Sequence, residues 1–371
     1  MSKRALGIIN IEPSYVHVEG IEDYRPISAT SFMGRYRIID FIISNLTNSG
    51  VNNIEVQVKN RPRSTIQHIQ RTDYNINTKR GHIRILHGEK PIPNEIYNTD
   101  VASLMANLKY FEEDNAPYVI LAPSHFIYVQ DFSKMLDYHI ESKNDITVLY
   151  QNVNSANEDF LMCDTLDIDE NKVITSIDKN LGKGKRAKVS LETYIMSKKI
   201  FVDMIYAALS TSSLYSLSDI IADGLDVFKI GGYLHTGYAA CISTLNSYYK
   251  ASMDIKNEKE LSNIFSDEWP IYTATNDTCP TTYTKTSNVS NCVVGNGCVI
   301  EGTVENCVIG RNVVVKEGAV IKDSIIMPDA LINKNVKMDK CVVDRLAIVT
   351  HIKALNGSDH APLYVKRGDR I

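Results

Sequence analysis

A six-residue apolar repeat in the last quarter of the chain is the feature that most constrains its fold. From Asn291 onward, apolar residues recur every six positions in two adjacent series, Val313, Ala319, Ile325 and Leu331, and Val314, Val320, Ile326, Ile332 and Met338. Glycines and asparagines stand between the apolar pairs, where turns need a permissive backbone. The pattern predicts a parallel β-helix, whose stacked coils bury one continuous aliphatic core. An antiparallel sandwich with coincidental spacing is the alternative.

The preceding residues, up to about position 275, alternate continuous apolar runs with segments of helical periodicity. We expect strands at residues 4–10, 53–58, 118–122, 145–151 and 189–196, and helices at residues 37–48, 99–112, 132–141, 197–208 and 216–225. Continuous apolar runs are typical of buried, largely parallel strands, and the intervening helices indicate βαβ units. The sequence therefore predicts an α/β domain over residues 1–268, a linker over 269–284 and the β-helix domain over 285–371.

Composition limits the classes of function. A chain of 371 residues is long enough for two domains, and its net charge of −4 gives no reason to expect nucleic-acid or membrane binding. No apolar run approaches the roughly 20 residues that span a bilayer, and the first ten residues lack a signal-peptide core. Seven cysteines without CxxC or framework spacing indicate reduced thiols, so we expect a cytoplasmic protein.

Four ordered stretches resemble a single family. They are GRYRIIDF from Gly34 with the following SN and NSG, STIQHIQ from Ser64, the segment from Gly237 that ends in SYY, and WPIYT from Trp269. Together they are similar to glucose-1-phosphate adenylyltransferase (ADP-glucose pyrophosphorylase). The resemblance implies a Rossmann-like, GT-A-like mixed sheet followed by a left-handed β-helix of hexapeptide repeats. It also implies a reaction that converts ATP and glucose 1-phosphate to ADP-glucose and pyrophosphate.

The glycine-rich phosphate loop of that family has no counterpart in this chain. Such a loop lets backbone amides approach a triphosphate without clashes from Cβ atoms. Here the first strand is followed by Ile11, Glu12, Pro13, Ser14 and Tyr15, and residues 1–30 contain only two glycines. Glu12 places negative charge where the triphosphate would lie, and Pro13 removes a donor. The loop is therefore expected not to bind nucleotide in the family's manner.

The metal-binding and lysine positions of the family have also changed. The resemblance places one Mg²⁺-binding acid at Ser124 and the second at Cys241, whose soft thiol does not suit magnesium. The early catalytic lysine falls on Ile27, whereas Lys179 corresponds to a lysine that contacts the sugar phosphate. We therefore expect no catalytic residue, no metal and no cofactor in this chain, with Mg²⁺ only in a catalytic partner, and Lys179 as a vestigial contact or a surface lysine.

Basic side chains gather in one region of this acidic protein. Residues 59–90 hold eight lysines and arginines against two acids, and two more arginines lie just before them. Arginine presents a planar donor fork that matches phosphate, and the resembled family binds sugar-phosphate, phosphate or sulfate effectors in this region. The alternative is a solvated face with incidental ion pairs. The candidate effector-binding residues are Arg35, Arg37, Lys59, Arg61, Arg63 and Arg71.

A chain that keeps the fold and loses its metal ligands resembles the GlgD-type subunit of that family. This resemblance implies a regulatory, catalytically degenerate protein of bacterial glycogen biosynthesis, paired with a catalytic GlgC-type subunit in a heterotetramer. A divergent but active transferase using Asp100 or Asp23 is one alternative, and a non-enzymatic sugar-phosphate-binding scaffold is another. A hexapeptide acyltransferase is disfavoured because residues 289–350 contain no histidine to act as general base.

Overall fold

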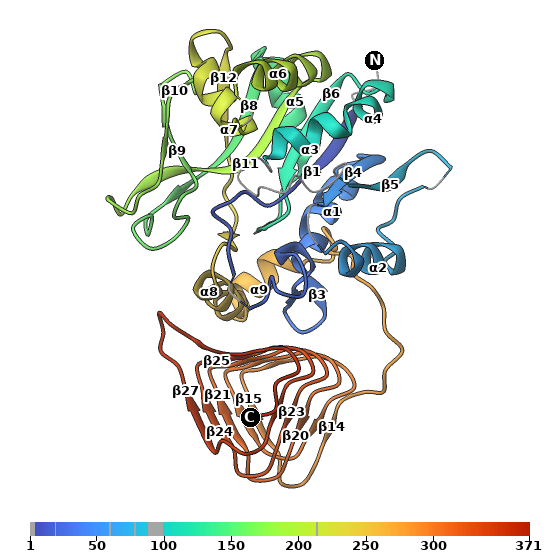
Figure 1. Cartoon of the computed structure of the whole chain (residues 1–371), viewed down its shortest axis with the longest axis vertical. Coiled ribbons are helices and arrows are strands. Elements are labelled where there is room, and N and C mark those ends of the chain that lie inside the picture. Colours follow the sequence, from blue (N-terminus) through green and yellow to red (C-terminus); the bar gives the residue numbers. More distant parts are fainter. Residues whose placement is uncertain (1–3, 19, 59–60, 78, 88–98, 213) are drawn as a thin grey trace.

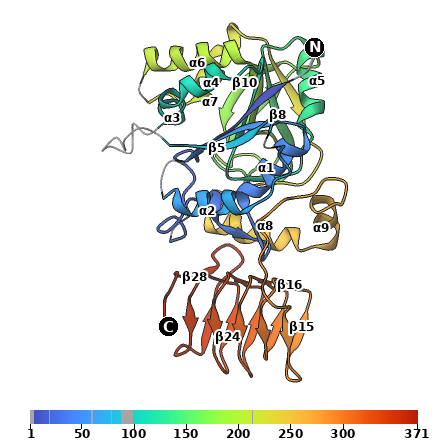
Figure 2. The same cartoon turned by 90° about the vertical axis from the view of Figure 1, so that its right-hand side faces the viewer.

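The computed structural model describes residues 4–18, 20–58, 61–77, 79–87, 99–212 and 214–371. An α/β domain stacks on a triangular β-helix, which Figure 1 shows along the axis of its coils and Figure 2 shows from the side. Within the described ranges, the structure contains no helix with the length and apolar character needed to cross a membrane.

A nine-stranded mixed sheet forms the centre of the α/β domain. Its strands are β1 (Ala5–Asn10), β4 (Asn53–Val58), β5 (His82–His87), β6 (Tyr118–Pro123), β8 (Ile146–Val153), β9 (Asp164–Ile168), β10 (Ile174–Lys179), β11 (Ala187–Ser197) and β12 (Ile230–Leu234). β1 runs parallel to β4 and β6, but β11 runs antiparallel to both β6 and β8. The expectation of largely parallel strands is therefore wrong for β11, which follows the reversal of the chain in the β9–β10 hairpin at one edge of the sheet.

Helices cover both faces of this sheet, as expected for buried strands. One face packs on α1 (Ile38–Asn48), α2 (Arg63–Arg71) and α5 (Phe132–Ser142). The other face packs on α3 (Asp100–Ala106), α4 (Leu108–Glu113), α6 (Lys198–Thr211) and α7 (Leu217–Asp223), which a short 3-10 turn (Gly224–Asp226) follows. The single helix expected at 99–112 is broken at Asn107, whose side chain donates to the carbonyl oxygens of His87 and Ser103.

The C-terminal part is a β-helix with three parallel sheets, one on each side of the triangle. The sheets contain β14 (Thr282–Tyr283), β17 (Val299–Ile300), β20 (Val314–Val315), β23 (Leu331–Ile332) and β26 (Ile348–Val349); β15 (Asn288–Ser290), β18 (Thr303–Glu305), β21 (Val320–Lys322), β24 (Lys337–Asp339) and β27 (Ala354–Asn356); and β16 (Val293–Val294), β19 (Val308–Ile309), β22 (Ile325–Ile326), β25 (Cys341–Val343) and β28 (Leu363–Val365). Every pairing is parallel, so the β-helix prediction is confirmed and the antiparallel alternative is wrong. The arrangement is that of a left-handed β-helix of hexapeptide repeats.

The coils do not follow a strict six-residue step throughout. Val314 pairs with Leu331, which lies seventeen residues later and one residue short of three hexads. The residue of the hexad that points into the core therefore changes from coil to coil. Val315 and Ile321 are fully buried, whereas their neighbours Val314 and Val320 remain partly exposed.

A separate apolar core joins the two parts. It is supplied by the 3-10 turn Ile27–Ala29, β2 (Ser31–Phe32), β3 (Tyr36–Arg37), α8 (Leu245–Ile255) and α9 (Glu258–Ile264), which lie between the sheet and the β-helix in Figure 2. Val308, Ile325 and Met327 of the β-helix pack into this core. Arg25 Nη2 also donates to Asp344 Oδ1 across the junction at 2.7 Å, with both side chains buried. The two parts are therefore fixed to each other by packing and by a buried ion pair.

Candidate functional site

The positions expected to hold metal-binding acids lie close together at the end of β6. Asn10 and Pro123 are register partners at the ends of β1 and β6, and the turn Ser124–His125 follows directly. β7 (Phe126–Tyr128) then pairs with β13 (Ala239–Cys241), so that Cys241 stands opposite Phe126. Carboxyl ends of adjacent parallel strands are where open α/β sheets bind ligands. The fold thus keeps the usual location of the site while the ligand residues differ.

Tyr15 occupies this location. Its hydroxyl donates to Glu192 Oε1, lies 3.2 Å from His125 Nε2 and lies 3.6 Å from Cys163 Sγ. Because the phenol proton goes to Glu192, the Tyr15 oxygen is free to accept a hydrogen bond from the His125 ring. In the resembled family the corresponding loop carries phosphate-binding glycines. In this chain the loop places the aromatic ring of Tyr15 beside His125 and Glu192.

Glu192 is an acidic residue that the sequence interpretation missed. It lies in β11 where the register with β8 shifts between Ser190 and Thr193, and its backbone has φ of +49°. Burial raises the pKa of Glu192 to about 7 and lowers the pKa of His125 to about 3. Glu192 is the one charged residue in the strand predicted at residues 189–196, and this was the available signal.

The donor set around Tyr15 does not suit magnesium. It consists of one carboxylate already bonded to Tyr15, one neutral imidazole and the thiols of Cys163 and Cys241, whereas Mg²⁺ prefers several hard oxygen ligands. Among the residues that the structure describes, no three His, Cys, Asp or Glu side chains are grouped to hold a metal ion.

The remaining positions taken from the resemblance are engaged elsewhere. Ile27 is fully buried in the apolar core at the domain junction. Lys179 Nζ donates to the buried Asp164 at 2.5 Å. Asp100 accepts from Asn10 Nδ2 at 2.9 Å and from the backbone amide of Leu217, and Asp23 is solvent-exposed in the loop before Arg25. Asp100 is thus committed to internal hydrogen bonds.

A second site lies between the domains and is lined by arginines. This cavity of about 940 Å³, the arginine cavity, is bounded by α2, the β2–β3 hairpin, the linker and the turns of the β-helix. Its lining includes nine arginines and a single carboxylate, Asp329, among the described residues. The arginines are Arg25, Arg35, Arg37, Arg61, Arg63, Arg71, Arg311, Arg345 and Arg367.

Five of the six predicted effector-binding residues line this cavity together. They are Arg35, Arg37, Arg61, Arg63 and Arg71. The sixth, Lys59, lies outside the described residues. Other basic residues of the same region lie elsewhere: Arg80 and Arg84 line a different groove beside Glu55. The basic residues that lie close together in the sequence therefore line two separate surfaces, and only some of them line the arginine cavity.

Four cavity arginines were not among the predicted ones, because they come from distant parts of the chain. Arg311 and Arg345 lie on the same corner of the β-helix two coils apart, with Asp329 between them. Arg345 Nη2 donates to Asp329 Oδ2 at 2.8 Å, and Arg311 Nη2 donates to the Ala274 carbonyl oxygen at 3.1 Å. The spacing of Arg311 and Arg345 by two coils is visible in the sequence and could have predicted that they share one side of the β-helix.

Several guanidinium groups of this cavity keep buried nitrogens without a hydrogen-bond partner. They are Nε and Nη1 of Arg25, Nε of Arg311 and Nε of Arg345. Arg25 is 96% buried, so these nitrogens are not satisfied by bulk water. Burial, together with the charges of Arg345 and Arg25, lowers the pKa of Arg37 to about 10. Asp344 and Asp329 pair with two of these arginines, Arg25 and Arg345. The cavity still concentrates an excess of positive charge and unused donors, which is the chemistry that recognises phosphate.

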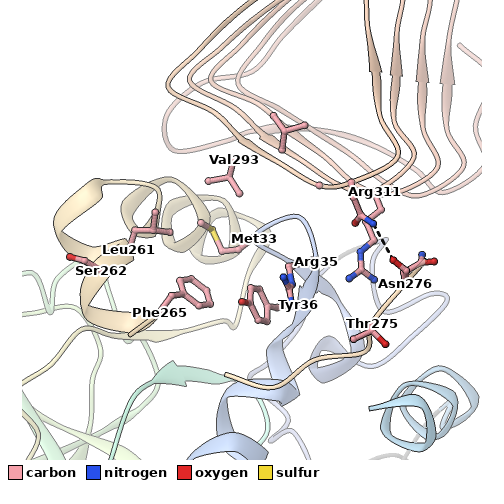
Figure 3. Close-up of a pocket in the computed structure, with 13 residues that line it drawn as sticks. Met33, Arg35, Tyr36, Leu261, Ser262, Phe265, Thr275, Asn276, Val293 and Arg311 are labelled. Atoms are coloured by element: carbon pink, nitrogen blue, oxygen red, sulfur yellow. Dashed lines mark hydrogen bonds between the residues drawn. The ribbon is translucent and has the colours of Figure 1, made fainter. Parts of the chain in front are cut away.

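A more apolar pocket adjoins the arginine cavity and shares Arg35, Tyr36 and Arg311 with it. This junction pocket has a volume of about 690 Å³ and lies between α9 and the first coils of the β-helix. Tyr36 and Phe265 stack in its floor with ring centroids 4.7 Å apart, and Figure 3 shows Arg311 projecting from the β-helix towards Arg35. Val293 and Val294 form part of its opposite wall.

Comparison with known proteins shows which protein family has this pair of domains. The nucleotidyl transferase family model matches residues 25–258, and the model described as GlmU-like, C-terminal hexapeptide matches residues 278–361. The chain belongs to the nucleotidyl transferase family, in the group that contains GlgD and glucose-1-phosphate adenylyltransferase.

Individual relatives within this family show which of its members the chain is similar to. The glycogen biosynthesis protein GlgD of Bacillus subtilis (strain 168) is 28% identical over 99% of this chain and 97% of its own length. GlgD of Geobacillus stearothermophilus is 29% identical over 86% of this chain and 83% of its own length. The glucose-1-phosphate adenylyltransferase of Lachnospira eligens is 30% identical over 78% of this chain and 69% of its own length.

Proposed function

We propose that this chain is a regulatory, catalytically degenerate subunit of a glucose-1-phosphate adenylyltransferase assembly in bacterial glycogen biosynthesis. Its partner would be a catalytic GlgC-type subunit that carries the phosphate loop and the Mg²⁺ ligands. Relatives named for glycogen biosynthesis and for the transferase reaction support the pathway and the choice of partner.

The observation that carries this proposal is the contact of Tyr15 with Glu192 and His125 at the end of β6. Tyr15 bonds Glu192 where substrate phosphates would need amides, and the two expected acid positions hold Ser124 and Cys241. A transferase of this kind accelerates its reaction by positioning and by charge neutralisation. The carboxylate of Glu192 is already engaged by Tyr15, which supports the proposal that this chain does not supply that neutralisation itself.

The arginine cavity supports an effector role for the same chain. It holds an excess of arginines and lies where both domains contribute walls, so an anion bound there would contact both of them. A ligand shifts an equilibrium only by its differential affinity for two states. A sugar phosphate or phosphate bridging the domains would favour one domain arrangement and thereby influence a partner subunit.

A direct test compares the chain alone, the GlgC-type catalytic subunit from the same organism alone, and the two combined. ADP-glucose formation is measured with saturating Mg²⁺, ATP and glucose 1-phosphate. We expect no turnover for this chain alone and a changed rate or effector response for the mixture. Turnover by this chain alone near the enzyme median of about 10 s⁻¹ would overturn the proposal.

Two controls separate the parts of the proposal. Size-exclusion chromatography of the mixture tests whether a stable complex forms, independently of activity. Calorimetric titration of inorganic phosphate and of sugar phosphates into this chain alone tests the arginine cavity without a partner. Phosphate binding without complex formation would favour the sugar-phosphate-binding scaffold over the regulatory subunit.

A further inference from the structure

The two stacked thiols at the start of the β-helix form a site that the proposed function does not use. Cys292 and Cys307 come directly before β16 and β19, whose register partners are Val293 and Val308. The two cysteines therefore occupy the same corner of consecutive coils. Neighbouring strands lie about 4.8 Å apart, which is within the usual Cα separation of about 4.4–6.8 Å for a disulfide.

Hydrogen bonds tie the thiols of the two coils together. The backbone amide of Cys307 donates to Cys292 Sγ at 3.4 Å, and on the next two coils of the same corner the amide of Cys341 donates in the same way to Ser324 Oγ at 3.0 Å. Cys292 thus forms the first step of a ladder of small polar side chains. Cys307 and Cys341 are fully buried, whereas Cys292 is only partly buried and can be reached by small reagents.

The surroundings of Cys292 favour its thiolate. Lys256, at the C-terminal cap of α8, donates to the side chain of Asn306, next to Cys307, and so holds an ammonium group near Cys292. Hydrogen bonding from the Cys307 thiol outweighs burial and lowers the pKa of Cys292 to about 7, with further help from the Cys307 amide and Lys256. The opposite holds for Cys307, where burial raises the pKa of the thiol.

We propose that Cys292 and Cys307 are a peroxide-sensitive thiol pair, with Cys292 the attacking thiol and Cys307 the resolving thiol. The Cys292 thiolate attacks a peroxide oxygen, the O–O bond breaks, and a sulfenic acid and hydroxide form. The Cys307 sulfur then attacks the sulfenic sulfur and forms the S–S bond. The hydroxide that leaves combines with the Cys307 proton as water, and the hydroxide released in the first step takes up the proton that Cys292 lost on ionisation. The peroxide is thus reduced to two waters while two thiols are oxidised.

The bond would join the first two coils beside the junction pocket. Val293 and Val294, which follow Cys292 directly, line that pocket, and α8 and α9 pack against this end of the β-helix. The Cys292 Sγ donates to the carbonyl oxygens of Ser290 and Val304 at 3.0 and 3.4 Å, and the structural cysteine Cys298 differs from it in burial rather than in this hydrogen bonding. Cys298 is buried, and its Sγ donates to the carbonyl oxygens of Gly295 and Gly310 at 3.2 and 3.0 Å.

The first measurement is the pH dependence of alkylation of the full chain by iodoacetamide, mapped by mass spectrometry. Cys279, which is exposed in the linker, is the internal control. At pH 7 half of a thiol with pKa 7 is ionised against about 3% for an ordinary thiol, but its thiolate is about five-fold less nucleophilic. We therefore expect Cys292 to react about three-fold faster than Cys279 at pH 7. Alkylation of Cys292 more slowly than Cys279 at this pH would contradict the proposal.

The second measurement maps the product of mild hydrogen peroxide treatment. Trypsin with a glutamate-specific protease releases residues 286–301, which hold Cys292 and Cys298, and residues 306–311, which hold Cys307. We expect these two peptides to be joined, with the loss of two hydrogen atoms, in the unmodified chain and in Cys298→Ser. The joined peptides should be absent from Cys292→Ser.

Two further variants keep the proposal falsifiable. Cys307→Ser should leave Cys292 as a sulfenic acid that dimedone traps, and Lys256→Gln should slow alkylation of Cys292 at pH 7. Circular dichroism checks that each variant is folded. If folded, peroxide-treated protein gives no joined peptides, or if Cys292→Ser still gives them through Cys298, the pair is not the redox site.

Discussion

The hydroxyl of Tyr15 lies 3.2 Å from His125 Nε2 and donates to Glu192, which is 177 residues further along the chain. This contact joins the loop after β1, the turn after β6 and the irregular part of β11. It places a carboxyl group whose pKa is raised by burial near the buried imidazole of His125.

The first prediction concerns the pH dependence that Glu192 introduces. A carboxyl group whose pKa is about 7 when folded and 4.5 when unfolded stabilises the protein most below pH 4.5, and this contribution is lost as pH rises to about 7. Glu192→Gln mimics the protonated acid and accepts from Tyr15. We expect it to match the parent in unfolding free energy at pH 5 and to exceed it by roughly 1–3 kcal/mol at pH 8.

Urea unfolding at both pH values measures this difference. His125 has the opposite sign, because its folded pKa of about 3 makes stability fall as pH drops from 6.5 towards 3. That effect is common to the parent and Glu192→Gln and therefore cancels in the comparison. A difference between the two proteins that does not change from pH 5 to pH 8 would show that Glu192 titrates normally.

The second prediction concerns the ion pair across the domain junction. Arg25→Met would leave Asp344 buried with only Tyr364 and the Arg345 amide as donors. Removing one partner of a buried pair typically costs about 3–5 kcal/mol. We expect a loss of this size in urea unfolding. Lys250→Met, which breaks a more exposed pair with Asp159, is the matched control and should cost less than about 1 kcal/mol.

The third prediction concerns anion binding in the arginine cavity, and it rests on the proposed effector role. Arg311→Gln and Arg345→Gln each remove a guanidinium group with an unused buried nitrogen. A charge-assisted hydrogen bond is worth about 1.5–3 kcal/mol, so each variant should weaken phosphate binding by roughly 10-fold to 150-fold in titration calorimetry. Arg186→Gln removes an exposed arginine outside the cavity and should leave the affinity unchanged. Equal affinities in all three variants would exclude this cavity as the phosphate site.

The fourth prediction concerns Asn45, which connects three segments. Its side chain donates to the Tyr128 carbonyl oxygen at 2.9 Å and accepts from the Gln130 amide at 3.2 Å and from Trp269 Nε1 at 3.0 Å. Asn45→Ala leaves these buried groups unsatisfied, so we expect a loss of roughly 2–4 kcal/mol in unfolding free energy. Trp269 is the single tryptophan, and its fluorescence should change together with this loss. Asn48→Ala, which removes one bond to the Pro270 carbonyl oxygen, is the milder control.

Much of the fold could be predicted because the relevant signals are local. The hexad repeat specifies a β-helix, since each coil contacts only its neighbours and the same short pattern is sufficient for every coil. The expected strands at 53–58 and 118–122 coincide with β4 and β6 to within a residue. The direction of β11 could not be predicted, because an apolar run is equally compatible with parallel and antiparallel pairing.

The candidate sites show the same division. The expectation that the family's glycines, acids and lysine are replaced can be formed from the linear chain, because each is a residue type at a motif position. Which side chains then gather at the end of β6 cannot be predicted there. Tyr15, His125, Cys163 and Glu192 come from four separate segments.

The sequence by itself determined the two kinds of architecture, the absence of the usual phosphate loop and the basic character of the region around α2. Only the tertiary structure decided that Arg25, Arg311, Arg345 and Arg367 join that region in one cavity, and that Cys292 stacks on Cys307. The physical reason is that charge and thiol chemistry depend on distances of a few ångströms between segments far apart in the chain. Those distances are set by domain packing and coil register, which no local pattern records.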